Sequence, residues 1–257
     1  MLDVDRNIVT DIPNVDSLGL PPVLKDVVMA KRGLVLFVGA TGSGKSTSLA
    51  ALIDHRNSNS GGHIITIEDP IEYVHDNKMA VVEQREVHAD TMSFTNALKY
   101  VLRQDPDVIL IGEMRDPETI AAALTAAETG HLVLATLHTN SAPQSIDRII
   151  DSFPAHQQNQ IKLQLAGTIL GILAQRLVPR KTGEGRIAAF EIMAGTPAVQ
   201  SLIREGKTAH LQSIIETGFK DGMMTMDRAL RELYQENKIS REAYNSLTKT
   251  VSTQAEF

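Results

Sequence analysis

The chain has 257 residues, a net charge of −6 and 42% hydrophobic residues, which is typical of one large or two modest folded domains. The acidic balance gives no global attraction to nucleic acid or anionic lipid, and the absence of cysteine excludes disulfides, thiolate metal sites and cysteine nucleophiles. Residues 1–5 are unlike a secretory signal, and the longest uncharged apolar stretch, residues 163–175, is too short to span a membrane and is expected to be a buried helix.

The order of polar and apolar segments suggests three parts. Residues 1–12 are polar and charged, and we interpret them as a linker or remnant of a preceding domain. We expect residues 13–195 to form the main domain and residues 196–257 a C-terminal helical region.

Residues 39–46, GATGSGKS, fit the pattern G-x-x-x-x-G-K-[ST] between an apolar strand at 33–38 and a helical pattern at 46–54. The glycines allow backbone N–H groups to approach phosphate oxygens, where the positive end of the helix adds to the attraction. We predict that Lys45 reaches the β- and γ-phosphates of ATP and that the Ser46 hydroxyl ligates Mg²⁺. A chance glycine turn is the alternative, and the flanking strand and helix argue against it. The predicted nucleotide-binding residues are Gly39, Thr41, Gly42, Ser43, Gly44, Lys45, Ser46 and Thr47.

Strand and helix patterns alternate along the following part of the chain, which predicts βαβ units and a mainly parallel sheet. Beyond residue 141 the pattern is mostly helical, with one hairpin and then four short helices over 196–250. Strands are predicted at 63–67, 81–87 (an edge strand), 107–113, 132–136, 173–179 and 186–193, and helices at 23–30, 94–103, 116–130, 144–151 and 155–171.

Acidic residues follow two of the predicted strands. The strand at 63–67 runs into Glu68 and Asp69, with Glu72 three positions further on, and the strand at 107–113 closes on Glu113. Acids at the carboxyl ends of parallel strands lie at the edge where such sheets bind ligands. We predict that Glu72 and Glu113 orient or deprotonate the attacking water, and that Glu68 or Asp69 holds Mg²⁺ through its waters. The alternative is that these acids are solvated loop residues.

Two histidines, His131 and His138, flank the strand at 132–136. Seven strand positions separate them by about 23 Å and place them on opposite faces, so they cannot share a metal ion. His138, at the carboxyl end with Thr136 and Thr139, is a candidate sensor of the γ-phosphate, and a hydrogen-bonded structural histidine is the alternative.

Four stretches together resemble the type IV pilus retraction ATPases, the PilT/PilU group of the secretion-type hexameric ATPases. The resemblance covers residues 12–239, nearly the whole chain. The matching motifs are the Walker A motif at 39–46, the Asp box at 68–72, the Walker B region at 111–116 and the His box at 129–139.

The resemblance implies a RecA-like P-loop core followed by C-terminal helices and assembled as a ring of six. It implies that Glu72 is the catalytic glutamate, Glu113 the Walker B glutamate, and His138 the histidine that reports nucleotide state. The implied protein is a cytoplasmic, ATP- and Mg²⁺-dependent motor that drives pilus retraction and twitching motility. Its implied partners are an inner-membrane platform protein and a paralogous motor ATPase.

The sequence departs from the group at three places. Members carry an N-terminal PAS-like domain, to which only residues 1–12 could correspond, and arginines there complete the neighbouring active site, whereas Thr10 and Asp11 precede Ile12 here. The signature AIRNLIRE reads AVQSLIRE at 198–205, with Gln200 and Ser201 in place of Arg and Asn. Assembly and type II secretion members carry a tetracysteine zinc insertion, so the absence of cysteine favours the retraction branch.

Two other function classes are alternatives to a pilus motor. The missing N-terminal domain motivates an accessory nucleotide-binding subunit of a pilus or secretion motor, with little turnover alone. A DNA translocase is disfavoured, because the chain is acidic and has four tyrosines, six phenylalanines and no tryptophan for base stacking.

Overall fold

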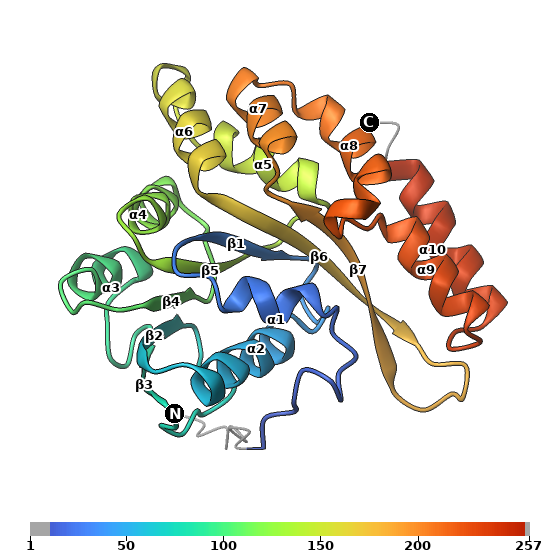
Figure 1. The fold of residues 1–257 in the computed structure, drawn as a ribbon, viewed down its shortest axis with the longest axis horizontal. Helices are drawn as coiled ribbons and strands as arrows, with labels where there is room; N and C mark the ends of the chain where they lie inside the picture. Colours follow the sequence, from blue (N-terminus) through green and yellow to red (C-terminus); the bar gives the residue numbers. More distant parts are fainter. Residues whose placement is uncertain (1–10, 255–257) are drawn as a thin grey trace.

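A seven-stranded sheet in the order β3-β2-β4-β5-β1-β6-β7 forms the centre of the computed structural model, which describes residues 11–254 (Figure 1). Strands β1 to β6 run parallel, and β7 pairs antiparallel with β6. The predicted α/β fold with a mainly parallel sheet is therefore confirmed. The strands are β1 Gly33–Val38, β2 Gly62–Glu68, β3 Ala80–Glu86, β4 Val108–Ile111, β5 Leu132–Leu137, β6 Ile169–Pro179 and β7 Arg186–Ala194.

Helices cover both faces of this sheet (Figure 1). Leu34 and Leu36 of the central strand β1 pack toward α3 to α7, whereas Val35 and Phe37 pack toward α1 and α2. This alternation follows from the two-residue repeat of a strand, and it explains why β1, β4 and β5 are buried at every position. The helices are α1 Val23–Val28, α2 Lys45–Asn59, α3 Phe94–Val101, α4 Pro117–Glu128, α5 Ala142–Asp151, α6 Ala155–Thr168, α7 Pro197–Glu205, α8 Leu211–Thr217, α9 Met226–Gln235 and α10 Arg241–Gln254, with short 3₁₀ turns at Thr208–His210 and Gly218–Asp221.

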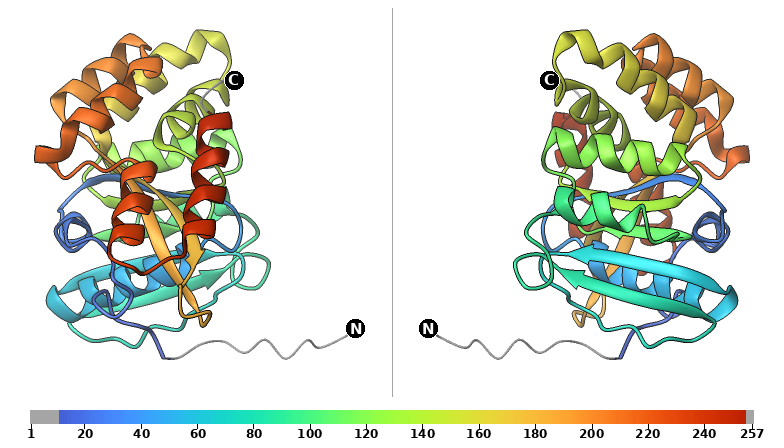
Figure 2. Two further views of the ribbon diagram at one scale, coloured as in Figure 1. Left: turned by 90° about the vertical axis from the view of Figure 1, so that its right-hand side faces the viewer. Right: turned by 90° about the vertical axis from the view of Figure 1, so that its left-hand side faces the viewer.

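The C-terminal helices attach to the sheet in two groups. Helices α7 and α8 share one hydrophobic cluster with α5 and α6, whereas α9 and α10 pack over the β6–β7 hairpin (Figure 2). The division at residue 195 stays a prediction. The expected linker at 1–12 lies outside the described residues apart from residues 11 and 12. Over the described part of the chain, no helix combines the length and apolar character required to cross a membrane.

Most predicted elements are confirmed, including the edge position of β3 and the hairpin. The expected buried helix over 163–175 is wrong, because α6 ends at Thr168 and β6 begins at Ile169. Ile169 pairs with Leu34 of β1, and Gly171 pairs with Val35. A β-branched residue and a glycine weaken helix propensity here, and pairing with the buried central strand stabilises the extended form.

The first turn of α4 provides a test of helix capping. The Asp116 carboxylate accepts hydrogen bonds of 2.8 Å from the Thr119 backbone N–H and from the Thr119 hydroxyl. Asp116→Ala is expected to cost about 0.5–2 kcal/mol of unfolding free energy at pH 7, measured by urea denaturation. Asp116→Asn is the matched control, because it keeps an acceptor oxygen.

The capping effect should also depend on pH. Burial acts to raise the pKa of Asp116, but the hydrogen bonds from Thr119 outweigh it and hold the pKa below its ordinary value of 3.8. The contribution of the charged cap is therefore present above that value and is lost as pH falls through the folded-state pKa. The stability difference between the natural chain and Asp116→Ala should shrink as pH falls below 3.8, and an undiminished difference at low pH would contradict the capping role.

Candidate functional site

The carboxyl ends of β1, β2, β4 and β5 meet at one edge of the sheet, where a cavity of about 520 Å³ lies. Because parallel strands all end at the same edge, loops that are distant in sequence converge there. The cavity is lined by these sequence-predicted residues: Thr41, Gly42, Gly44, Lys45, Ser46, Thr47, Glu68, Asp69, Glu72, Glu113 and His138. The other two predicted residues lie beside it: the Gly39 carbonyl contacts Lys45, and Ser43 is buried within the loop.

The glycine loop between β1 and α2 has the shape of a phosphate cradle. Gly42 and Gly44 have φ angles of +77° and +89°, which favour glycine. A Cβ atom on Gly44 would lie 2.9 Å from the Gln175 Nε2 atom and 3.3 Å from a Leu177 methyl group. The loop leads into the N-terminus of the 15-residue helix α2, whose free N–H groups and dipole favour an anion.

Lys45 is the buried cation of this cavity, with only 8% of the residue exposed. Its ammonium group donates hydrogen bonds to the carbonyl oxygens of Gly39, at 2.7 Å, and Ala40, at 3.1 Å. Burial lowers the pKa of Lys45, while the nearby carboxylates of Glu113 and Glu72 act in the opposite direction. The loop carbonyls thus hold the cation close to the carboxylates of two other strand ends.

Glu72 lies against the first turn of α2. Its Oε1 atom accepts a hydrogen bond of 2.7 Å from the Ser46 hydroxyl, and the hydroxyls of Thr47 and Tyr73 lie 3.0 Å apart. Two adjacent residues of the loop after β2 therefore contact two adjacent residues of the phosphate-binding helix, 26 positions away in the chain.

Glu113, after β4, lies between two cationic or ionisable side chains. His138 Nε2 is 3.0 Å from one carboxylate oxygen of Glu113, and the Arg115 guanidinium pairs with the other. Burial acts to raise the pKa of Glu113, but the Arg115 hydrogen bond and the charges of His138 and Arg115 outweigh it, so the pKa is lowered. This group is therefore a carboxylate at neutral pH.

Ser46, Glu68 and Asp69, the predicted Mg²⁺-binding residues, are among the residues that line the cavity. Glu68 accepts hydrogen bonds from Thr66, at 2.6 Å, and Gln84, at 3.2 Å, and burial raises its pKa against their effect. Over residues 11–254, no three His, Cys, Asp or Glu side chains gather as a metal-binding group. A site with only a few carboxylates beside a phosphate cradle is suitable for Mg²⁺, because this ion keeps several of its waters and binds substrate phosphates.

Sequence reasoning missed several residues of the cavity. The sequence contained a signal for Arg115, because this residue follows the predicted Glu113 by two positions at a strand end and could have been expected in the same cavity. Leu177 and Arg186 come from the β6–β7 hairpin, and no pattern in the sequence links them to the glycine loop. His131 lies at the amino end of β5, where its Nδ1 atom is 3.0 Å from the Ala126 carbonyl oxygen, away from His138.

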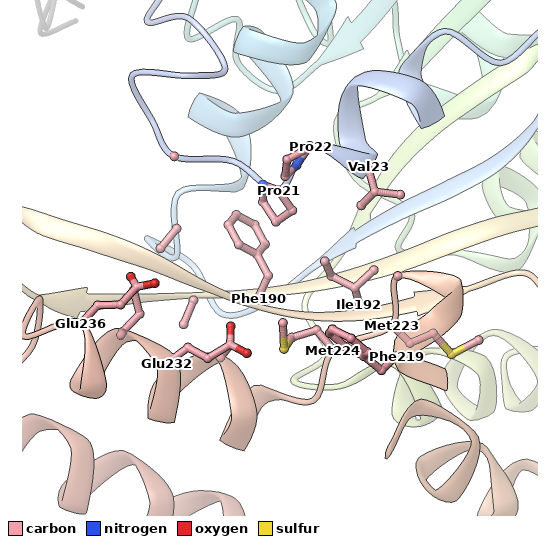
Figure 3. Close-up of a pocket in the computed structure, with 16 residues that line it drawn as sticks. Pro21, Pro22, Val23, Phe190, Ile192, Phe219, Met223, Met224, Glu232 and Glu236 are labelled. Atoms are coloured by element: carbon pink, nitrogen blue, oxygen red, sulfur yellow. The ribbon is translucent and has the colours of Figure 1, made fainter. Parts of the chain in front are cut away.

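A second cavity, of about 360 Å³, lies outside the motif cluster (Figure 3). It is mainly apolar and lies between the segment that leads into α1, strand β7 and helix α9. Phe190 and Ile192 of β7 line it, and Glu232 of α9 and Glu236, which follows that helix, lie at one side (Figure 3). The ion pairs of Glu232 with Arg228 and of Glu236 with Lys238 offset the charge of that side.

A parallel sheet, a phosphate cradle at a helix N-terminus and facing carboxylates at neighbouring strand ends occur together in P-loop nucleoside triphosphatases, and this is the class that the fold defines. Within that class, the chain belongs to the type II/IV secretion system protein family. The model of this family matches residues 14–256. Membership in this family of secretion ATPases supports ATPase activity.

The relatives include two pilus ATPases of Pseudomonas aeruginosa. The chain is 52% identical over 239 residues to the type IV pilus retraction ATPase PilT, covering 93% of this chain and 69% of PilT. It is also 52% identical over 237 residues to the type IV pilus ATPase PilU, covering 92% of this chain and 62% of PilU. The predicted resemblance to the retraction ATPases is confirmed.

A crystal structure of the pilus retraction motor PilT with bound ADP has the same fold. It superposes with a TM-score of 0.86 at 47% identity, over 93% of this chain and 67% of that chain. The chain thus spans about two thirds of the length of these relatives.

The geometry of the glycine loop predicts different effects for two alanine substitutions. Both Gly42→Ala and Gly44→Ala place an L-residue at positive φ, which costs roughly 1–2 kcal/mol. Only Gly44→Ala also meets Gln175 and Leu177, since no atom lies within 4 Å of a Cβ on Gly42. We expect Gly44→Ala to weaken ADP binding at least tenfold more than Gly42→Ala, measured by titration with a fluorescent ADP analogue. Equal affinities for two equally well-folded variants would contradict this account of the cradle.

Proposed function

We propose that this chain is the ATP-hydrolysing core of a ring-shaped motor that powers retraction of a type IV pilus. The observation that carries the proposal is the 2.7 Å hydrogen bond between Ser46 and Glu72. It brings a carboxylate of the loop after β2 to the first turn of the phosphate-binding helix. The similarity to proteins named PilT and PilU supports pilus retraction as the work that hydrolysis drives.

The residues of the cavity divide the chemistry among them. The loop N–H groups and Lys45 hold the phosphates, while Ser46, with Glu68 or Asp69, would hold Mg²⁺. Mg²⁺, when bound, neutralises charge on the β- and γ-phosphate oxygens. The oxygen of water attacks the γ-phosphorus, the bond to the bridging oxygen breaks, and the water proton leaves to a carboxylate.

Glu72 is the better proton acceptor of the two candidate glutamates. Glu113 is paired with Arg115 and His138, and its lowered pKa makes its carboxylate a weak base. Glu113 instead orients the attacking water or the γ-phosphate, and His138, bonded to it, reports the nucleotide state. The exposed Arg115, with 70% of its side chain accessible, lies at the cavity where developing negative charge needs a cation.

The finer features of the proposal follow the family resemblance. The chain works as a homohexamer in the cytoplasm, at the inner membrane, through a platform protein and alongside a paralogous motor ATPase. The division into a RecA-like core at 13–195 and a helical region at 196–257 belongs to the same proposal. An alternative is an accessory nucleotide-binding subunit of a pilus or secretion motor, with little turnover alone.

The assignment of Glu72 predicts that binding and hydrolysis can be separated. Glu72→Gln should lower the rate of ATP hydrolysis about 10²–10⁴-fold and leave the affinity for Mg²⁺–ADP within threefold, because the amide cannot accept the water proton. Phosphate release and fluorescent nucleotide titration measure the two quantities. Lys45→Ala should abolish binding, and Glu216→Gln, an exposed carboxylate of α8, should change neither. Full turnover in Glu72→Gln would remove its catalytic assignment.

The motor and accessory hypotheses predict different concentration dependence. If active sites are completed between subunits, turnover per subunit should rise steeply as the protein concentration passes the range in which rings form. Steady-state hydrolysis and sedimentation velocity, measured on the same samples, give the two curves. A flat value near zero despite ring formation would favour the accessory subunit, and Lys45→Ala provides the background rate.

A further inference from the structure

The loop that carries Glu72 is not part of a helix or strand. It spans residues 69–79 and connects β2 to the edge strand β3 (Figure 1). Glu72 is exposed, so burial does not fix its position. Its neighbours must therefore be held by contacts from elsewhere if the carboxylate is to stay in one place.

Two side chains of β3 bind the residues on either side of Glu72. The Glu86 carboxylate accepts a hydrogen bond of 3.0 Å from the Ile71 backbone N–H. The Gln84 amide nitrogen donates a hydrogen bond of 2.8 Å to the Tyr73 carbonyl oxygen. Positions 84 and 86 share one face of the strand because side chains alternate along it. The two side chains therefore bracket Glu72 from the same side.

The same Gln84 side chain makes two further contacts. Its amide oxygen accepts a hydrogen bond of 2.8 Å from the His75 backbone N–H, and its nitrogen lies 3.2 Å from Glu68 Oε1. One carboxamide thus joins the Glu72 loop to the end of β2, and it does so with both its donor and its acceptor atoms.

The strand that carries these two side chains is itself fixed in register. Gln84 pairs with Thr66, and Glu86 pairs with Glu68, in the parallel ladder of β2 and β3. The other side of the loop is joined to α2 through the Tyr73 and Thr47 hydroxyls. The loop is consequently held between an edge strand and the phosphate-binding helix.

We propose that Gln84 and Glu86 are positioning residues for hydrolysis, which hold the Glu72 carboxylate at the attacking water without touching the nucleotide. The inference rests on the proposed function. A displacement of about 1 Å in a catalytic group can lower a rate about 10²-fold, whereas phosphate affinity depends on the glycine loop and Lys45. Loss of the hydrogen bonds that Gln84 and Glu86 make to this loop therefore reduces turnover and leaves nucleotide binding unchanged.

The first test uses Gln84→Met, which keeps the length of the side chain and removes its hydrogen bonds. We expect turnover at saturating ATP to fall about 10- to 100-fold, with the affinity for Mg²⁺–ADP within threefold. Hydrogen exchange of the peptides that cover 71–75 should become about fivefold faster, because the His75 N–H loses its acceptor and the Tyr73 carbonyl loses its donor, so the loop opens more often. Glu83→Gln is the matched control: it lies on the same strand, faces the opposite side and pairs with Arg85.

A second pair of variants tests the hydrogen bond between Glu86 and the Ile71 N–H. Glu86→Gln keeps an oxygen that can accept from the Ile71 N–H, so it should retain most of the turnover, whereas Glu86→Ala should behave like Gln84→Met. A role in stability alone would lower the unfolding temperature of Glu86→Ala and leave the turnover of its folded fraction unchanged.

The outcomes separate this inference from the proposed function. Unchanged exchange at 71–75 in Gln84→Met, or unchanged turnover despite faster exchange, overturns the positioning role. Equal losses in binding and turnover also overturn it, since they indicate a damaged cradle. If the natural chain forms rings and binds ATP without hydrolysing it, the proposed function fails, and the exchange data still decide whether β3 holds the loop.

Discussion

Parallel strands bring their carboxyl ends to one edge of a sheet, and the site of this protein depends on that constraint. Each crossover helix returns the chain to the opposite edge before the next strand begins, so the loops after β1, β2, β4 and β5 face one another. Lys45, Glu72, Glu113 and His138 meet although they span almost a hundred positions of the chain. The apolar interior of the sheet holds these loop bases rigidly, and the polar chemistry is confined to the rim.

The glutamates at this edge of the sheet differ in their nearby charges, their burial and their hydrogen bonds. Glu113 has two partners that stabilise its charged form, whereas Glu68 is buried and its pKa is raised despite two hydrogen bonds. Glu72 is exposed and bonded to the Ser46 hydroxyl. Environment therefore separates three glutamates that look alike in the sequence, and the proposed division into base, orienting group and metal-side group follows from that separation.

The hairpin β6–β7 connects the nucleotide cavity to the C-terminal helices. Leu177 and Arg186 line the cavity, Gln175 lies beneath the glycine loop, and α9 and α10 pack over the same two strands. The same hairpin therefore contacts both the glycine loop and the C-terminal helices α9 and α10.

Local pattern in the sequence determined most strands, the glycine loop and the acidic strand ends, because each depends on residues that are close along the chain. It also carried the resemblance to the retraction ATPases. The start of β6 was misread, since pairing of Ile169 and Gly171 with β1 overrides local helix propensity. The pairing of Glu113 with His138, the entry of Arg186 into the cavity and the hold of Gln84 on the Glu72 loop were decided only by the tertiary structure. These contacts join segments whose separation is set by strand order, and strand order is not visible in a local pattern.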